Sequence, residues 1–149
     1  MESETRVLSV VMPTFNEEKT IVEIIERVIK IPYLLELIVV DDCSTDNTSS
    51  VVGELAKRLD LIRYVRQEKN GGKTAALKTG FELSRGEIVI VQDADLELNP
   101  EEIEMVIQPI LDGRASVCYG SRFLNRGMHS ALYFRHFLAN KTLSFFSNC

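Results

Sequence analysis

Five short apolar runs, each followed by a polar turn, recur along the chain. A strand that is covered on both faces needs apolar residues at consecutive positions, so such runs are typical of parallel sheets. The pattern therefore predicts five strands, at residues 7–12, 37–40, 62–65, 88–91 and 116–119.

Between these runs, apolar residues recur at helical spacing, as Ile21, Ile24, Ile25 and Val28 do. The spacing predicts helices at residues 17–30, 47–59, 73–84 and 100–111, and a further helix at 128–148. Local signals mark the helix ends. Candidate caps are Asp46 or Asn47 for the second helix and Asn99, before Pro100, for the fourth, and left-handed glycines are expected at Gly86 and Gly113.

The alternation of strands and helices predicts an α/β fold, a Rossmann-like, mostly parallel sheet with helices on both faces. Such sheets bind ligands beyond the carboxyl ends of their strands. Polar motifs do follow the predicted strands, at residues 13–17, 41–46, 92–95 and 120–122. These motifs are therefore the candidates for function.

Composition narrows the class of protein. The chain has 149 residues, 45% of them hydrophobic, which suits one soluble domain spanning 1–149. Its net charge of −5 argues against a nucleic-acid partner. An acidic start without a signal peptide, the absence of any apolar run near ~20 residues and three widely spaced cysteines predict a cytoplasmic protein.

Asp93-Ala94-Asp95 is the most informative motif. Two carboxylates separated by one small residue, directly after a buried strand, suit a hard divalent cation, Mg²⁺ or Mn²⁺, with Glu97 as a third ligand. Such cations share their ligands with substrate phosphates, which indicates a metal that bridges a diphosphate. The alternative is a solvated acidic turn before the fourth helix.

Two further acidic positions can each be explained either by ligand binding or by a structural role at a helix start. Asp41 or Asp42 can accept hydrogen bonds from a nucleotide, or the acids there can serve only to cap the second helix. Glu17 can line the same pocket or interact with the dipole of the first helix. The Gly-Lys-Thr at 72–74 is not expected to be an ATPase loop, because Gln67 stands where the first glycine of that loop belongs.

Taken in order, Pro-Thr-Phe-Asn-Glu at 13–17, Val-Val-Asp-Asp-x-Ser-Thr-Asp at 39–46, Asn-x-Gly-Lys at 70–73, Gln-Asp-Ala-Asp at 92–95 and Tyr-Gly-Ser-Arg at 119–122 resemble the family 2 glycosyltransferases. The likeness is greatest to the dolichyl and polyprenyl phosphate mannosyl- and glucosyltransferases. It implies a GT-A fold and a nucleotide-diphosphate sugar donor, GDP-mannose or UDP-glucose.

The resemblance also assigns residues. It implies a Mg²⁺ or Mn²⁺ ion at Asp93, Asp95 and Glu97, and catalytic roles for Asp95, for Arg122 at phosphate and for Arg135, with Ser144, at an anionic polyprenyl or dolichyl phosphate acceptor. Displacement at the sugar would be inverting. The donor-binding residues that it implies are Pro13, Phe15, Glu17, Asp42, Lys73, Asp93 and Ala94.

The last third of the chain is basic and rich in aromatic residues. Its apolar positions at 132–146 suit either the core face of a helix or an amphipathic helix in peripheral contact with the cytoplasmic face of a membrane. Members of the family continue well past this length, so the acceptor-binding part is expected to be missing or incomplete. The alternative function is a nucleotide-sugar-binding module without turnover. A sugar nucleotidyltransferase is disfavoured, because that class would be expected to have a glycine-rich loop after the first strand, where this chain has Pro-Thr-Phe-Asn-Glu.

Overall fold

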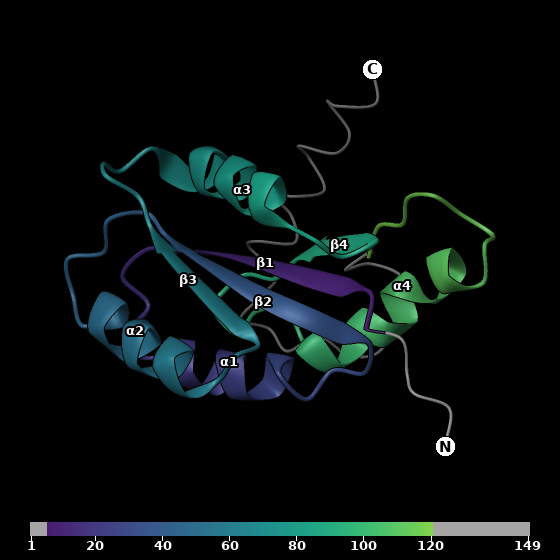
Figure 1. Ribbon diagram of the computed structural model, residues 1–149, viewed down its shortest axis with the longest axis horizontal. Coiled ribbons are helices and arrows are strands. Elements are labelled where there is room, and N and C mark those ends of the chain that lie inside the picture. The colour runs from purple at the N-terminus through teal and green to yellow at the C-terminus, as the bar shows by residue number, and fades with distance from the viewer. Residues whose placement is uncertain (1–5, 121–149) are drawn as a thin grey trace, which may run out of the picture. The chain divides into compact units, whose positions relative to one another are not determined.

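The structure is a computed structural model and describes residues 6–120. In this part of the chain four parallel strands form one sheet in the order β3-β2-β1-β4 (Figure 1). The strands are β1 (Leu8–Thr14), β2 (Leu34–Asp41), β3 (Ile62–Arg66) and β4 (Ile88–Val91). The helices are α1 (Ile21–Val28), α2 (Thr48–Arg58), α3 (Gly72–Leu83), the short 3-10 helix η1 (Pro100–Glu102) and α4 (Ile103–Leu111).

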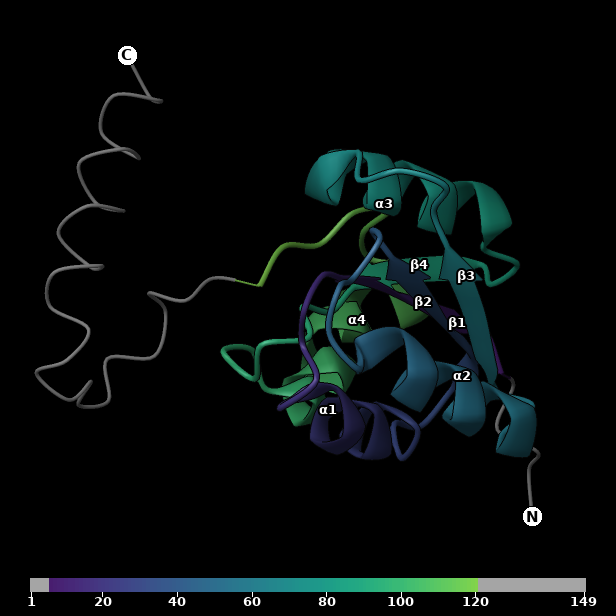
Figure 2. The same cartoon turned by 90° about the vertical axis from the view of Figure 1, so that its left-hand side faces the viewer.

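Helices cover both faces of the sheet, as predicted. Helices α1, α2 and α4 lie on one face and α3 lies on the other (Figures 1 and 2). Successive side chains of a strand point to opposite faces, so the buried residues divide into two sets. Leu8, Val10 and Met12 of β1 belong to the core beneath α1, whereas Ile38 and Val40 of β2 pack with Ala76 of α3. This two-sided burial is why the strands read as continuous apolar runs.

The predicted strand at residues 116–119 is wrong. The segment is irregular, and the side chains of Val117 and Tyr119 are 64% and 91% exposed. A strand needs a neighbour for its backbone groups, and within residues 6–120 this segment pairs with none. Apolar composition without a pairing partner does not make a strand.

Helix ends follow the sequence signals in part. Gly113 has the expected left-handed φ of 69° after α4. Gly86 does not, and it is a glycine for another reason: a Cβ there would lie 2.5 Å from the Val7 carbonyl oxygen. The segment before β4 therefore passes so close to the backbone of Val7 that only glycine fits at this position. The sequence prediction had explained the same glycine by a helix end.

The two predicted caps also differ in outcome. The Asp46 carboxylate accepts a hydrogen bond from the Thr48 N–H (3.0 Å), whereas the Asn47 side chain makes no capping bond. Asn99 stands at the N-cap position of η1, but its side-chain oxygen accepts from Arg27 of α1 rather than from η1. The predicted helix at 128–148 lies outside the described residues. No helix within residues 6–120 is long and apolar enough to cross a membrane.

Candidate functional site

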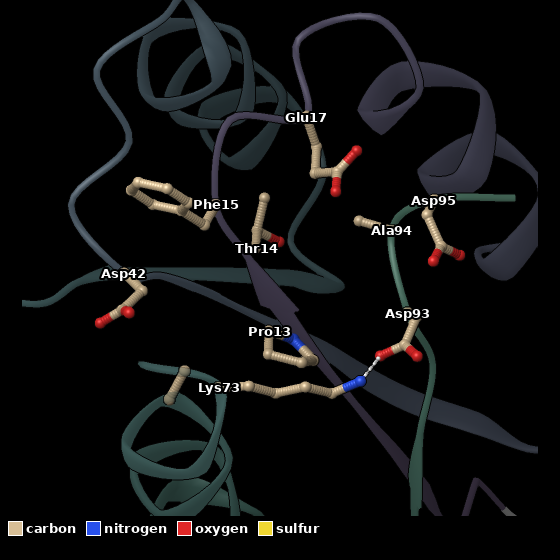
Figure 3. A pocket seen from close by; sticks show the side chains of 10 residues that line it. Pro13, Thr14, Phe15, Glu17, Asp42, Lys73, Asp93, Ala94 and Asp95 are labelled. Carbon is tan, nitrogen blue, oxygen red and sulfur yellow. Dashed lines mark ion pairs between the residues drawn. The ribbon is translucent and has the colours of Figure 1, made fainter. Parts of the chain in front are cut away.

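A pocket opens at the carboxyl ends of the strands, where the fold class predicts a ligand site (Figure 3). The end of β1 lies in its middle, with Asp42 on one side and the turn after β4 on the other, as the strand order requires. All the predicted donor-binding residues line it. The lining consists of Pro13, Thr14, Phe15, Glu17, Asp42, Lys73, Ala76, Asp93, Ala94 and Asp95.

One wall of the pocket is built by two loops that bind each other. The Asn16 N–H donates to the Ser44 hydroxyl (3.0 Å), and the Asn16 side-chain oxygen accepts from the Thr45 N–H (2.7 Å). The Glu17 N–H donates to the Thr48 hydroxyl (2.9 Å). These bonds join the loop after β1 to the loop after β2, and they hold Phe15 and Glu17 at the rim.

The first helix begins later than predicted. Residue 17 was the predicted start, but α1 begins at Ile21, after a turn in which the N–H groups of Thr20 (3.1 Å) and Ile21 (2.9 Å) both donate to the Glu17 carbonyl. Glu17 therefore precedes the helix. Its carboxylate accepts from the Thr20 hydroxyl (3.0 Å) and lines the pocket.

The two adjacent aspartates at the end of β2 differ in their surroundings. Asp41 is fully buried and accepts hydrogen bonds from the Ser44 N–H (2.7 Å) and the Tyr64 hydroxyl (2.8 Å), away from the pocket lining. Asp42 lies in the pocket. Of the two candidates left open by the sequence, the structure thus leaves Asp42 as the one that can face a ligand.

The Asp42 carboxylate also binds the backbone at the Gly-Lys-Thr segment. It accepts hydrogen bonds from the backbone N–H groups of Gly71 (2.8 Å) and Gly72 (2.7 Å) and from the Gln67 side chain (2.9 Å). Two backbone N–H groups at the start of α3, where an ATPase loop would hold phosphate, are thus bound to this carboxylate. A carboxylate has about four lone-pair sites, so about one is left for a ligand.

This arrangement makes the charge state of residue 42 important for folding. An Asp42→Asn variant would turn an N–H₂ group toward backbone donors, and we expect the free energy of unfolding to fall by about 1–2 kcal/mol. Urea denaturation measures the change. Asp60→Asn, at an exposed aspartate in the turn before β3, is the matched control and should stay within about 0.5 kcal/mol of wild type. Equal stability of the two variants would contradict the role of Asp42.

The turn after β4 is held from beneath by a buried glutamine. Gln92, only 2% exposed, donates to the backbone carbonyls of Asp93 (3.1 Å) and Leu98 (3.3 Å). Within the turn, the Asp95 carboxylate accepts from the Glu97 N–H (3.0 Å). Residues 93–95 are therefore presented to the pocket by a fixed turn, with Ala94 buried between the two carboxylates.

Lys73, in the first turn of α3, reaches across the pocket to this turn. Its ammonium nitrogen lies 2.6 Å from an oxygen of Asp93 (Figure 3). The Asp93 carboxylate thus pairs with one cationic group, and the chemistry of Asp93 and Asp95 fits a cation site. Within residues 6–120 no three acidic, histidine or cysteine side chains gather into one metal site, so Glu97 does not complete a preformed set with Asp93 and Asp95. Two carboxylates suffice for Mg²⁺ when waters and substrate phosphates supply the other ligands.

The structure adds two lining residues that the sequence prediction left out. Thr14 is the last residue of β1, next to two predicted residues. Ala76 lies three positions after Lys73, and this spacing places both on one face of α3. That spacing was the signal that could have found Ala76. The predicted residues Arg122, Arg135 and Ser144 lie outside the described residues.

Comparisons with known proteins identify the family and the fold. Residues 9–146 match "Glycosyl transferase family 2". The dolichol-phosphate mannosyltransferase of Pyrococcus furiosus is 34% identical over 122 residues, which are 80% of this chain and 34% of that protein. A mannosyltransferase from Pyrobaculum calidifontis, solved in complex with GDP-Man and Mn²⁺, is 36% identical with a TM-score of 0.55, over 63% of this chain and 28% of that one.

A second solved structure, S. aureus TarS in complex with UDP, is 31% identical with a TM-score of 0.61, over 71% of this chain and 32% of that one. The chain thus spans about a third of the length of these proteins. The sheet and its helices match theirs, which confirms the predicted GT-A fold. On the match over residues 9–146, this chain belongs to glycosyl transferase family 2.

Proposed function

We propose that the chain forms the donor-binding part of a glycosyltransferase that moves mannose or glucose from a nucleotide-diphosphate sugar to a polyprenyl or dolichyl phosphate. The observation that carries the proposal is one pocket that gathers the motif residues of four separate segments, from β1, β2, α3 and β4. Relatives whose names specify a polyprenyl phosphate acceptor support the acceptor class.

The nucleotide is expected on the side of the pocket formed by Asp42 and Phe15. Phe15 is 47% exposed at the rim, so a base that stacks on its ring would bury apolar surface. The remaining lone pair of Asp42 can accept a base or ribose hydrogen bond, with Glu17 and Pro13 completing the wall. Similar structures bound to GDP-Man and to UDP support a nucleotide-diphosphate sugar and leave the choice of base open.

The diphosphate is expected on the other side, beside Lys73, Asp93 and Asp95. We assign Asp93 and Asp95 as the ligands of a Mg²⁺ or Mn²⁺ ion and Glu97 as a ligand acting through water. When bound, the ion supplies positive charge that stabilises the departing nucleoside diphosphate. A similar mannosyltransferase was solved with Mn²⁺, which supports a divalent ion.

The proposed reaction is a direct displacement. An oxygen of the acceptor phosphate forms a bond to the anomeric carbon while the bond from that carbon to the diphosphate oxygen breaks, and the configuration inverts. A phosphate monoester is already anionic near neutral pH, with a second pKa of about 6, so it needs little help from a base. We assign Arg122 to the donor phosphates, and Arg135 with Ser144 to the acceptor phosphate.

The lipid acceptor places the reaction at a membrane surface. We therefore propose that the chain works at the cytoplasmic face of a membrane through peripheral contact, and that the basic residues after position 120 approach the anionic headgroups.

Calorimetric titration with GDP and with UDP, each with and without Mn²⁺, tests the donor site. We expect one of the two nucleotides to bind about tenfold or more tightly with Mn²⁺ than without it. Asp95→Ala should abolish that difference, because it removes one of the proposed metal ligands. Asp60→Ala, which removes the same charge at an exposed turn far along the chain from the motif, should retain it.

The outcomes separate the competing functions. Folded protein that binds neither nucleotide would refute the donor site. Metal-dependent binding without transfer of sugar to polyprenyl phosphate would favour the alternative, a nucleotide-sugar-binding module, for this length of chain. Transfer that is lost in Asp95→Ala and retained in Asp60→Ala would support the full proposal.

A further inference from the structure

One ion pair crosses the pocket rather than the protein surface. Lys73 and Asp93 lie 2.6 Å apart, nitrogen to oxygen, and the two side chains are 58% and 22% exposed. Figure 3 shows the lysine side chain extended from α3 to the turn after β4, with its ammonium group against Asp93 and with Asp95 farther along the turn, past Ala94. The pair joins two segments that contribute different chemistry to the site.

The start of α3 is held in place independently of this pair. The Asp42 carboxylate binds the N–H groups of Gly71 and Gly72, directly before the lysine. Two backbone N–H groups at the helix start are thus occupied, and the charged side chain that α3 contributes to the pocket lining is that of Lys73. That side chain is long and half-exposed, so it can change partner while the helix stays fixed.

We propose that Lys73 acts as an internal stand-in for the divalent ion at Asp93 and is exchanged for that ion when the donor binds. This rests on the proposed function. Without ligand, the lysine offsets part of the negative charge of Asp93 and Asp95. A divalent ion at the same carboxylate oxygen excludes the ammonium group by sterics and by like-charge repulsion. The displaced lysine then has a new anionic partner in the diphosphate.

The exchange has a thermodynamic signature. Metal alone must break the ion pair and leave Lys73 without its partner, so metal alone binds weakly. Metal together with a diphosphate gives the lysine a replacement, so each ligand strengthens the binding of the other by the same factor. Lys73 would thus be a positioning residue that couples metal and nucleotide, beyond any direct contribution to affinity.

Binding of Mn²⁺ alone, followed by the electron paramagnetic resonance signal of the free ion, tests the exchange without any catalytic assay. We expect Lys73→Gln to bind Mn²⁺ about three- to tenfold more tightly than wild type, because the competing cation is gone. Lys78→Gln removes the same charge from the same helix, where the lysine pairs with Glu82 outside the pocket, and should match wild type within about twofold. Lys73→Arg keeps the charge and should keep the weak affinity.

In the presence of saturating Mn²⁺, the same variant is expected to have the opposite effect on the affinity for nucleotide. There Lys73→Gln should bind GDP or UDP more weakly than wild type and Lys78→Gln, since the diphosphate loses a cation. Mn²⁺ affinity that is equal in Lys73→Gln and Lys78→Gln would overturn the exchange, as would a failure of both wild type and Lys73→Gln to bind Mn²⁺. If instead no variant binds a nucleotide while Lys73→Gln still binds Mn²⁺ more tightly, the proposed function fails and the competition at Asp93 stands.

Discussion

Replacing Glu36 by glutamine is expected to lower the free energy of unfolding by about 3–5 kcal/mol, the cost of breaking a buried ion pair from one side. Glu36 of β2 is 1% exposed. One carboxylate oxygen accepts from the Ser9 hydroxyl (2.8 Å) and the Arg85 N–H (2.8 Å), and the other accepts from the guanidinium groups of Arg63 (2.9 Å) and Arg85 (3.0 Å). An amide would turn two hydrogens toward these donors.

The matched control is Glu54→Gln. Glu54 pairs with Lys57 on the exposed face of α2, at 2.7 Å, and its loss should change stability by less than about 1 kcal/mol. Urea or thermal unfolding of the three proteins measures the contrast. If Glu36→Gln were as stable as Glu54→Gln, the buried carboxylate would not hold β3 and the segment before β4 to the sheet as the structure indicates.

The same carboxylate predicts how stability depends on pH. Burial alone would raise the pKa of Glu36, but the hydrogen bonds from Arg63, Ser9 and Arg85 outweigh burial and lower the pKa from 4.5 to about 2. A lowered pKa in the folded state means that the stabilisation is complete above pH 4.5 and is lost as the pH falls toward 2. The difference amounts to about 3 kcal/mol, so wild type and Glu36→Gln should approach each other in stability over that range.

A Gly80→Ala substitution is the second prediction, because it should destabilise a helix that alanine normally favours. Gly80 of α3 faces Val11 in the middle of β1, and an added Cβ would lie 2.2 Å from a Val11 methyl carbon. Valine has little rotational freedom at χ1 and Val11 is fully buried, so its side chain cannot move aside easily. We expect the variant to lose about 2–3 kcal/mol of stability, at the upper end for an overpacked core.

Gly53→Ala is the matched control on the other face of the sheet. Gly53 lies within α2, and a Cβ there would meet no atom within 4 Å. The same substitution should therefore stabilise the protein by about 0.5–1 kcal/mol through helix propensity. In the Gly80→Ala background, Val11→Ala should cost less than it does in wild type, which a double-mutant cycle by chemical denaturation measures. Effects of the same sign at both glycines would contradict the close packing of α3 on β1.

Much of the fold was predictable because it rests on local patterns. Apolar runs at 37–40 and 62–65 gave strands, since parallel strands are buried on both faces. The spacing of Ile21, Ile24, Ile25 and Val28 gave a helix with one buried stripe. The pocket was predictable as well, because the carboxyl ends of parallel strands meet at one edge and collect the motifs that follow them.

Other features depend on partners that are distant in the chain. The Asn16 N–H donates to the Ser44 hydroxyl, 28 residues away, and this contact joins the loop after β1 to the loop after β2. Residues 116–119 have the composition of a strand but no partner strand within residues 6–120. Gly86 has the sequence context of a glycine at a helix end, yet glycine is needed there because the Val7 carbonyl leaves no room for a Cβ. No local signal carries such information, because it concerns surfaces that meet only after folding.

By itself, then, the sequence determined the strand and helix pattern, the parallel sheet and the set of residues at its functional edge. The tertiary structure decided what those residues do there: that Asp42 holds the start of α3, that Asp41 faces Tyr64, and that Lys73 lies against Asp93. The physical reason is that hydrophobic periodicity and helix propensity are set by neighbouring positions in the sequence, whereas hydrogen bonds and ion pairs depend on distances that only the folded chain defines.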